Sequence, residues 1–207
     1  MNAKLIAILS ACSILSVLTV TWIVVQNQSS GDQFAECRTT RSAGGTGAIG
    51  GPFELVNGDG YTVTDTDVIT QPSILYFGYT FCPDLCPFDV VRNADVVDLL
   101  TARGQSVTPV FISIDPRRDT PDVIRDFTFN IHEKMIGLTG SNAQVKAASQ
   151  AYRVYYNAHL TEDEYYLVDH TTHSYLVLPD HGFVEFFRRD ITAEAMAEQV
   201  NCFLQNA

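Results

Sequence analysis

The stretch that decides the fold reads SILYFGYTFCPDLCP and occupies residues 73–87. Its first seven residues form an apolar run that is typical of a strand buried on both faces. From about Cys86 or Pro87 to Ala102, apolar residues recur at helical spacing, so a helix is predicted there. The two cysteines, Cys82 and Cys86, therefore lie where a buried strand ends and a helix begins.

Further elements are predicted on both sides of this stretch. Upstream, residues 52–67 alternate apolar and polar side chains around an Asn-Gly-Asp-Gly turn, which indicates a β-hairpin. The order of strands and helices predicts an α/β fold of the thioredoxin-like type, with a mixed sheet and an N-terminal β-hairpin extension. Two of the later strands, 165–168 and 174–178, are expected to be neighbours. The downstream strands are predicted at 107–114, 136–138, 165–168, 174–178 and 183–189, and the helices at about 121–130, 141–152 and 193–204.

The chain begins with a long apolar segment. Residues 5–25 contain no Asp, Glu, Lys, Arg or His over 21 positions, and as a helix they would span about 31 Å, roughly one membrane core. Lys4 is the only charged side chain before it, so the positive-inside rule predicts a single transmembrane helix with residues 1–4 in the cytoplasm. Residues 26–51 are rich in Gln, Ser, Gly and Thr and are predicted to form a flexible stalk, followed by the folded domain at 52–207.

Two alternatives to an uncleaved anchor stay open. A cleavable signal peptide has an apolar region of about 7 to 15 residues and a small-x-small site, but no such site follows Val25. The sequence Leu9-Ser10-Ala11-Cys12 resembles a bacterial lipoprotein box and would place a lipid on Cys12, although the apolar run continues well beyond it. All three interpretations place the domain outside the cytoplasm.

The charge balance restricts the partners. The chain has 13 Lys and Arg against 24 Asp and Glu, a formal net charge of -11. Phosphate binding depends on clustered Lys and Arg, so this composition argues against nucleic acid as a partner. An acidic surface also disfavours binding of the domain to anionic lipid. The remaining contact with a membrane is the predicted N-terminal helix.

The spacing of the two cysteines bears on their chemistry. Three residues separate Cys82 and Cys86, whereas thioredoxin-type redox sites have two, so the sulfur atoms can separate and leave space for an ion. Cys86 lies at or just before a helix N-terminus, where unpaired amides are expected to lower the pKa of its thiol. Two thiolates with one imidazole suit Cu(I), and suit Zn(II) less completely because structural zinc takes four ligands. A disulfide between the two cysteines is the alternative.

A third donor would have to come from the five histidines of the chain. His170 and His173 are three residues apart, which places them on opposite faces if they share a strand. His170 follows a predicted strand, at a junction from which its side chain can reach the cysteine loop, and His173 is assigned to the other face. The other histidines lie in polar loops or turns and are interpreted as solvent-exposed, namely His132, His159 and His181.

Three sequence blocks resemble those of one known family. GYTFCPDLCP at 78–87, SIDPRRDTP at 113–121 and VDHT at 168–171 resemble the signature blocks of the Sco/SenC proteins, and the resemblance covers about residues 50–205. It implies a thioredoxin fold, a membrane anchor and a role as a copper chaperone in the assembly of the binuclear copper centre of cytochrome c oxidase. It also implies the copper ligands, which in this sequence are Cys82, Cys86 and His170.

The same resemblance suggests roles for two acidic residues, and the sequence departs from the family pattern at three positions. Asp115 and Asp119 are expected to order the loop beside the metal without binding it. Phe81 stands where many relatives carry a polar residue such as His, which removes an additional donor. The family pattern does not predict Cys37 or Cys202, and in an oxidising compartment these two are predicted to form a disulfide that ties the stalk to the last helix.

Two functions follow as hypotheses. The first is a copper chaperone that holds Cu(I), and also Cu(II), receives it from an upstream donor and delivers it to subunit II of cytochrome c oxidase. The second is a thiol-disulfide oxidoreductase that uses Cys82 and Cys86 as a catalytic pair to reduce the acceptor cysteines before metal insertion. Against the second, residues 171–174 lack the proline that thioredoxins place opposite their redox pair.

The N-terminus also favours one compartment. It is short and carries no Arg-rich transit peptide, which favours a bacterial inner membrane with the domain in the periplasm. The alternative is a mitochondrial inner membrane with the domain in the intermembrane space.

Overall fold

The computed structural model describes residues 12–23, 32–38, 49–83, 85–160 and 165–207. The chain separates into two compact units, Met1–Glu36 and Cys37–Ala207. In the first unit residues 12–23 form a helix, and its large apolar side chains are exposed.

The predicted anchor at 5–25 is described only in part. Its residues 5–11, 24 and 25 lie outside the described residues, as do residues 1–4 and most of the predicted stalk. Among the helices of the described residues, none combines the length and the apolar character that crossing a membrane requires.

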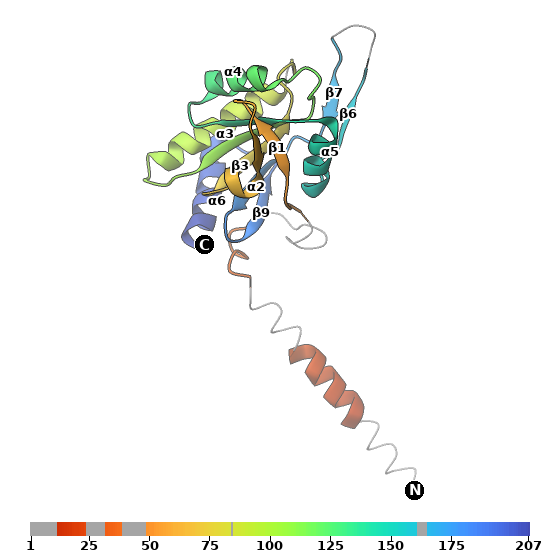
Figure 1. Cartoon of the computed structure of the whole chain (residues 1–207). Coiled ribbons are helices and arrows are strands. Elements are labelled where there is room, and N and C mark those ends of the chain that lie inside the picture. Colours follow the sequence, from red (N-terminus) through yellow and green to blue (C-terminus); the bar gives the residue numbers. More distant parts are fainter. Residues whose placement is uncertain (1–11, 24–31, 39–48, 84, 161–164) are drawn as a thin grey trace. The chain divides into compact units, whose positions relative to one another are not determined.

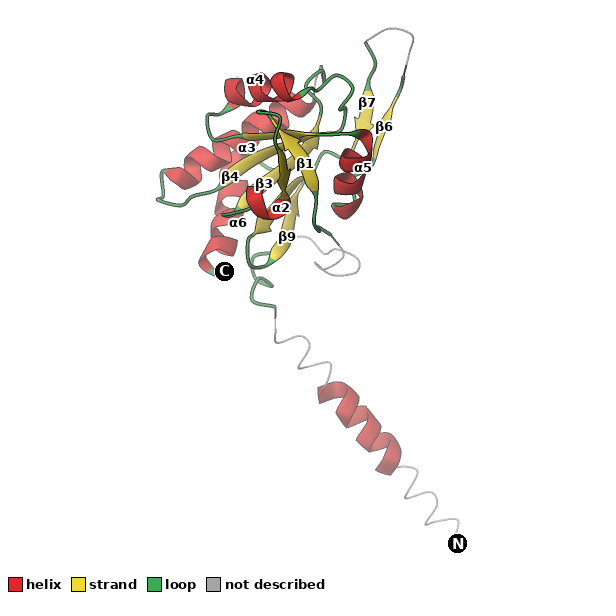
Figure 2. Cartoon of the chain, viewed as in Figure 1, coloured by secondary structure: helices red, strands yellow, loops and turns green. Residues whose placement is uncertain are grey.

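A seven-stranded mixed sheet forms the centre of the second unit (Figures 1 and 2), with the strand order β2-β1-β5-β4-β3-β8-β9. The central strands β3, β4 and β5 run parallel. The outer strands β1, β2, β8 and β9 are each antiparallel to their neighbours. The strands are β1 (Glu54–Asn57), β2 (Thr62–Thr64), β3 (Ser73–Gly78), β4 (Thr108–Ser113), β5 (Ile136–Thr139), β6 (Tyr156–Ala158), β7 (Val168–His170), β8 (Ser174–Leu178) and β9 (Gly182–Phe187).

The helices pack on this sheet and on one another. They are α2 (Asp65–Val68), α3 (Leu85–Thr101), α4 (Pro121–Ile131), α5 (Asn142–Ala151) and α6 (Ala193–Gln205). Helix α3 contacts β3, β4 and α6, and α4 contacts β5. Three helices begin at the residues that the sequence indicates, because Thr120, Ser141 and Thr192 each accept a hydrogen bond from a backbone N–H of the first turn. The predicted α/β architecture with a mixed sheet is therefore confirmed.

The predicted N-terminal hairpin is also confirmed, with two additions. Strands β1 and β2 form the hairpin, and the short helix α2 occupies the end of the segment that was predicted to be strand. Strand β1 also pairs with β5, so the hairpin extends the main sheet rather than standing apart from it.

One predicted strand pairing is wrong. Residues 165–168 were expected to lie beside 174–178, but β8 has β3 on one side and β9 on the other. Both edges of β8 are therefore occupied. The chain before β8 instead forms β7, which pairs with the short strand β6 in a separate two-stranded sheet. Strand β6 spans only three residues, too few for an alternating pattern to be recognised in the sequence.

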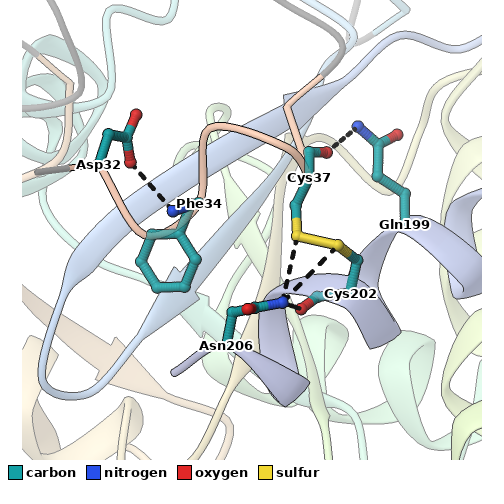
Figure 3. The surroundings of a disulfide bond; sticks show 6 residues. All are labelled: Asp32, Phe34, Cys37, Gln199, Cys202 and Asn206. Atoms are coloured by element: carbon teal, nitrogen blue, oxygen red, sulfur yellow. Dashed lines mark hydrogen bonds between the residues drawn. A yellow bond between two sulfur atoms is a disulfide. The ribbon is translucent and has the colours of Figure 1, made fainter. Parts of the chain in front are cut away.

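The predicted disulfide between Cys37 and Cys202 is confirmed (Figure 3). The two Cα atoms are 5.6 Å apart, and the bond joins residues that are 165 positions apart in the chain. Two hydrogen bonds support it: Gln199 Nε2 donates to the carbonyl oxygen of Cys37 at 3.0 Å, and Asn206 Nδ2 donates to that of Cys202 at 2.9 Å. The disulfide fixes the beginning of the second unit to α6.

Candidate metal centre

The cysteine loop begins where β3 ends. All six residues of β3 are buried, which fixes the point at which the chain leaves the sheet. The loop turns through a hydrogen bond of 3.3 Å from Cys82 N to the Tyr79 carbonyl, and Cys86 then lies in the first turn of α3. Cys82 and Cys86 are both buried, and neither takes part in a disulfide. The structure therefore contains two thiols here and not the alternative disulfide.

The fold brings Cys82, Cys86 and His170 together. One potential ligand atom from each residue lies within 4.8 Å of the other two, and Cys86 Sγ is 3.2 Å from His170 Nε2. Among the described residues, no other group of three or more His, Cys, Asp or Glu side chains meets the same geometric condition. The three residues singled out from the sequence thus converge, although they come from the cysteine loop, α3 and β7.

The orientation of His170 is set by the residue that follows it. His170 Nδ1 lies 2.9 Å from the carbonyl oxygen of Thr171. A carbonyl oxygen can only accept, so Nδ1 carries the proton, and Nε2 keeps its lone pair toward Cys86. The rings of Tyr76 and Tyr79 meet the imidazole edge-on, with centroid distances of 6.2 and 5.9 Å. In the neutral imidazole the nitrogen that carries the lone pair therefore faces the sulfur atoms, as in a metal ligand.

The expectation that the helix N-terminus lowers the pKa of Cys86 is wrong. A hydrogen bond with Cys82, together with burial, raises the pKa of the Cys86 thiol far above its ordinary value. The amide group of the first turn is directed at the other sulfur, since Cys86 N donates to Cys82 Sγ at 3.3 Å. The first turn of the helix thus directs an amide at Cys82 and not at Cys86, whose side chain is fully buried.

Gly78 allows the sulfur to approach the end of β3. A Cβ atom at this position would lie 2.9 Å from a ring carbon of Tyr76, 3.1 Å from one of Phe111 and 3.2 Å from Cys86 Sγ. Any larger side chain would displace at least one of these groups. A glycine inside an otherwise apolar strand is typical of such a close approach, so the sequence does contain this indication.

Asp119 holds the cysteine loop from the side of the second sequence block. Its side chain is fully buried and accepts hydrogen bonds from Thr80 N at 3.1 Å, Thr80 Oγ1 at 2.6 Å and Ser113 Oγ at 2.6 Å. Burial raises the pKa of Asp119, and these hydrogen bonds act in the opposite direction. Because Thr80 is two residues before Cys82, the predicted role of Asp119 in ordering the loop is confirmed.

Asp115 acts on the loop less directly. It forms a buried ion pair with Arg118 and accepts a hydrogen bond of 2.7 Å from the Tyr166 hydroxyl. Arg118 in turn lies beside Phe81, with the guanidinium carbon 5.0 Å from the ring centroid. Phe81 itself is half exposed. Neither aspartate belongs to the group of potential ligands.

The other histidines take no part in this group. His173 packs against Phe186 with a ring centroid distance of 4.8 Å, and burial lowers its pKa. His170 and His173 are not on one strand, because His170 ends β7 and His173 precedes β8. His159 and His181 are exposed as expected. His132 differs from the expectation: it faces Asp98 on α3, and its side chain is only 10% exposed.

Several residues around the site were not given a role from the sequence. Tyr76 and Arg118 contact it through packing between distant elements, and Thr171 orients His170 through its backbone. A single sequence carries no local pattern for such contacts. For Arg118 the only indication is its place inside the second block, between the two aspartates discussed above.

Comparisons with known proteins agree with this geometry. The family model described as SCO1/SenC matches residues 41–205. The chain is 48% identical to Protein SenC of Rhodobacter capsulatus over 204 residues, which cover 98% of this chain and 91% of that protein.

The chain is also similar to solved structures of copper-bound relatives. Arabidopsis thaliana ScoI with copper bound is 41% identical, with a TM-score of 0.72, and the match covers 76% of this chain and 99% of that one. Bradyrhizobium japonicum ScoI with copper bound is 36% identical, with a TM-score of 0.67, and the match covers 74% and 99% of the two chains.

Proposed function

The chain belongs to the SCO1/SenC family, and from this premise we propose that it is a copper chaperone in the assembly of cytochrome c oxidase. Its acceptor is the binuclear copper centre of subunit II. The observation that carries the proposal is the convergence of two sulfur atoms and one imidazole nitrogen within 4.8 Å. The copper bound to ScoI of Arabidopsis thaliana and of Bradyrhizobium japonicum supports the same cargo.

The donor set fits copper as the cargo. Cys82 and Cys86 offer soft sulfur donors, and His170 offers Nε2, a combination that suits Cu(I). Structural zinc sites have four ligands, and no fourth His, Cys, Asp or Glu donor joins this group among the described residues. A site of three donors is also suited to transfer, because ligands of an acceptor can enter and replace the original ones in turn.

The direct test of the function is transfer between two proteins. The full chain loaded with Cu(I) is mixed with the metal-free copper domain of subunit II, and copper in each protein is measured after separation. We expect copper to move to the acceptor. Retention of all copper on the chain, with an acceptor that accepts copper from free solution, would contradict the proposal.

His170→Ala is expected to weaken copper binding in a way that depends on oxidation state. The variant keeps both sulfur donors, which suffice to retain some Cu(I), but it loses the imidazole on which Cu(II) depends more strongly. Affinities for Cu(I) and Cu(II), measured by competition with chelators, should fall for both ions and fall most for Cu(II). X-ray absorption should show one nitrogen donor fewer than in the unchanged chain.

The matched control for this variant is His173→Ala. His173 is three residues away and packs on Phe186, outside the donor group, so its loss should leave both affinities unchanged. If His170→Ala binds both ions as the unchanged chain does, or if His173→Ala reproduces its effect, the ligand assignment is wrong.

A reductase that uses Cys82 and Cys86 as a catalytic pair is the second candidate, since both sulfur atoms are thiols. The position of His170 favours the chaperone, because dithiol exchange needs no imidazole 3.2 Å from the buried sulfur. The His170→Ala variant also separates the two activities. A reductase would keep its turnover of a disulfide-bonded acceptor peptide in this variant, whereas a chaperone would bind copper more weakly, Cu(II) most of all.

The proposed location is a bacterial inner membrane, with the domain in the periplasm and an N-terminal anchor. Two observations support it. The disulfide between Cys37 and Cys202 is typical of an oxidising compartment, and helix 12–23 exposes Ile14, Trp22 and the other large apolar side chains of that segment. A mitochondrial inner membrane is the alternative location. The proposed function also requires an upstream protein in the same compartment that donates copper to this chain.

A further inference from the structure

His170 is carried by a sheet that is separate from the one that positions the cysteines. Strands β6 and β7 form their own two-stranded sheet, whereas β3 lies in the seven-stranded sheet. Figure 1 shows the β6–β7 hairpin projecting beside the main sheet. No backbone ladder therefore fixes His170 relative to Cys82 and Cys86. Their relative position depends on the short link of residues 171–173, which joins His170 to β8, and on side-chain contacts between the hairpin and the rest of the domain.

Two tyrosines provide part of this connection. Val168 N, in β7, donates to the Tyr79 hydroxyl at 3.3 Å. The Tyr166 hydroxyl donates to Asp115 Oδ1 at 2.7 Å. Both contacts come from the strand that ends at His170, or from the residues just before it. They lie on the face of the hairpin that is turned toward the domain, since Tyr166 and Val168 are buried.

Arg118 connects the hairpin with the cysteine loop. Its Nη1 donates to the Tyr166 carbonyl oxygen at 2.9 Å, and the guanidinium carbon lies 3.6 Å from the centroid of the Tyr166 ring. On the other side the same carbon is 5.0 Å from the Phe81 ring and 5.5 Å from the Tyr79 ring. Phe81 directly precedes Cys82. The ion pair with Asp115 keeps the side chain in place, and both partners are at least nine-tenths buried.

We propose that Arg118 is a positioning residue that holds the His170 hairpin against the cysteine loop and so makes His170 available as the third donor. The inference rests on the proposed copper function. It means that Arg118 determines whether copper has two donors or three at this site. A contact from one buried guanidinium to both segments couples them more directly than packing through several side chains. Loss of the contact lets the hairpin, with His170, move away while Cys82 and Cys86 stay in place.

Arg118→Lys is the informative variant. It keeps the positive charge beside Asp115, but an ammonium group lacks the planar fork that donates to a carbonyl while stacking on an aromatic ring. Changes in groups that orient a metal ligand typically cost 10- to 100-fold in metal affinity. We expect the affinity of the full chain for Cu(II) to fall at least about tenfold, with a smaller change for Cu(I). The nitrogen hyperfine structure in the Cu(II) electron paramagnetic resonance spectrum should weaken.

A double-mutant cycle tests whether Arg118 acts through His170. In a His170→Ala background, Arg118→Lys should change the Cu(II) affinity by less than about twofold, because the donor that it positions is already absent. An equal loss in both backgrounds would show a general structural role and would overturn the inference. Arg117→Lys is the control: Arg117 is exposed and lies 5.9 Å from the same Tyr166 ring, and its change should have little effect.

A second readout needs no copper. Hydrogen exchange in the copper-free chain should become faster in Arg118→Lys at Val168 and at the paired residues of β6 and β7, while the amides of β3 keep their protection. Unchanged exchange in the hairpin would contradict the inference, as would an increase throughout the domain. If the unchanged chain binds no copper, the proposed function is wrong. If it binds copper and Arg118→Lys keeps the nitrogen donor, only the inference about Arg118 is wrong.

Discussion

Cys86→Ser is expected to abolish retention of Cu(I) while the domain stays folded. Cys86 is the fully buried member of the pair, and its sulfur faces both His170 Nε2 at 3.2 Å and the Cys82 side chain. A hydroxyl group is a poor ligand for a soft monovalent ion. Because loss of a merely orienting group already costs 10- to 100-fold in metal affinity, loss of a donor should cost more than about 100-fold.

The measurement is a competition titration of the copper-free chain with a Cu(I) chelator under reducing conditions. Cys12→Ser is the matched control, because Cys12 is an exposed thiol on helix 12–23 and its loss should leave the affinity unchanged. Cys82→Ser should behave like Cys86→Ser. Urea unfolding of each copper-free variant checks that the fold is kept, as expected for substituting oxygen for sulfur without added volume.

One result would contradict both the ligand role of Cys86 and the chaperone model. If Cys86→Ser still bound one Cu(I) per chain with an affinity within tenfold of the unchanged protein, the sulfur would not be a donor. If Cys86→Ser loses affinity but also unfolds, Cys82→Ser provides the test of the sulfur donors. Cys82 is 9% exposed, so its substitution disturbs the core less.

The sequence predicted the elements that depend on local or periodic patterns. The buried run at residues 73–79 became β3, and the helices predicted at about 121–130, 141–152 and 193–204 lie within one or two residues of their observed bounds. The error at 165–168 has a different origin. The pattern placed the strand at 165–168, whereas β7 spans Val168–His170, and it gave the wrong partner, since pairing depends on which sheet edges are free.

At the site, too, the sequence predicted what local patterns carry and missed what depends on the assembled fold. The two cysteines and the histidine were singled out from residue type, spacing and the family blocks, and the fold brings them together. The direction of the pKa shift at Cys86 was missed, because it depends on the hydrogen bond with Cys82 and on burial, which only the folded chain shows. Arg118 was missed as a connecting residue because its partners, Phe81 and Tyr166, are distant in the sequence. Such contacts exist only once the sheet, the second block and the hairpin are assembled.

The disulfide lies far from this site, and that separates its effects from those on copper. Helix α6 lies along α3, and the pairs Arg103–Glu198 and Gln105–Asn201 place its second half beside the C-terminal end of α3. Cys86 lies at the opposite end of α3. A helix of 17 residues is about 25 Å long, so Cys202 and the metal centre are separated by roughly that length.

Removing this disulfide, by Cys37→Ser or Cys202→Ser, is expected to lower the free energy of unfolding by about 5 kcal/mol in the chain-entropy model. The bond closes a loop across 165 positions, so its loss mainly enlarges the unfolded ensemble. For a domain of this size the melting temperature should fall by roughly 10 to 20 °C. Helix α6 should stay in place, because Met196, Val200 and Phe203 remain fully buried.

Urea unfolding of the copper-free chain without reductant measures the change. The two single variants and the double variant should be equally destabilised, since each lacks the same bond, and dithiothreitol should bring the unchanged chain to the same level. Copper affinity should not change, because the bond is remote from Cys86. A loss below about 1 kcal/mol would show that the unfolded chain is already as restricted without the bond, contrary to the entropic argument. A coupled loss of copper affinity would show that α3 transmits strain from one end of the domain to the other.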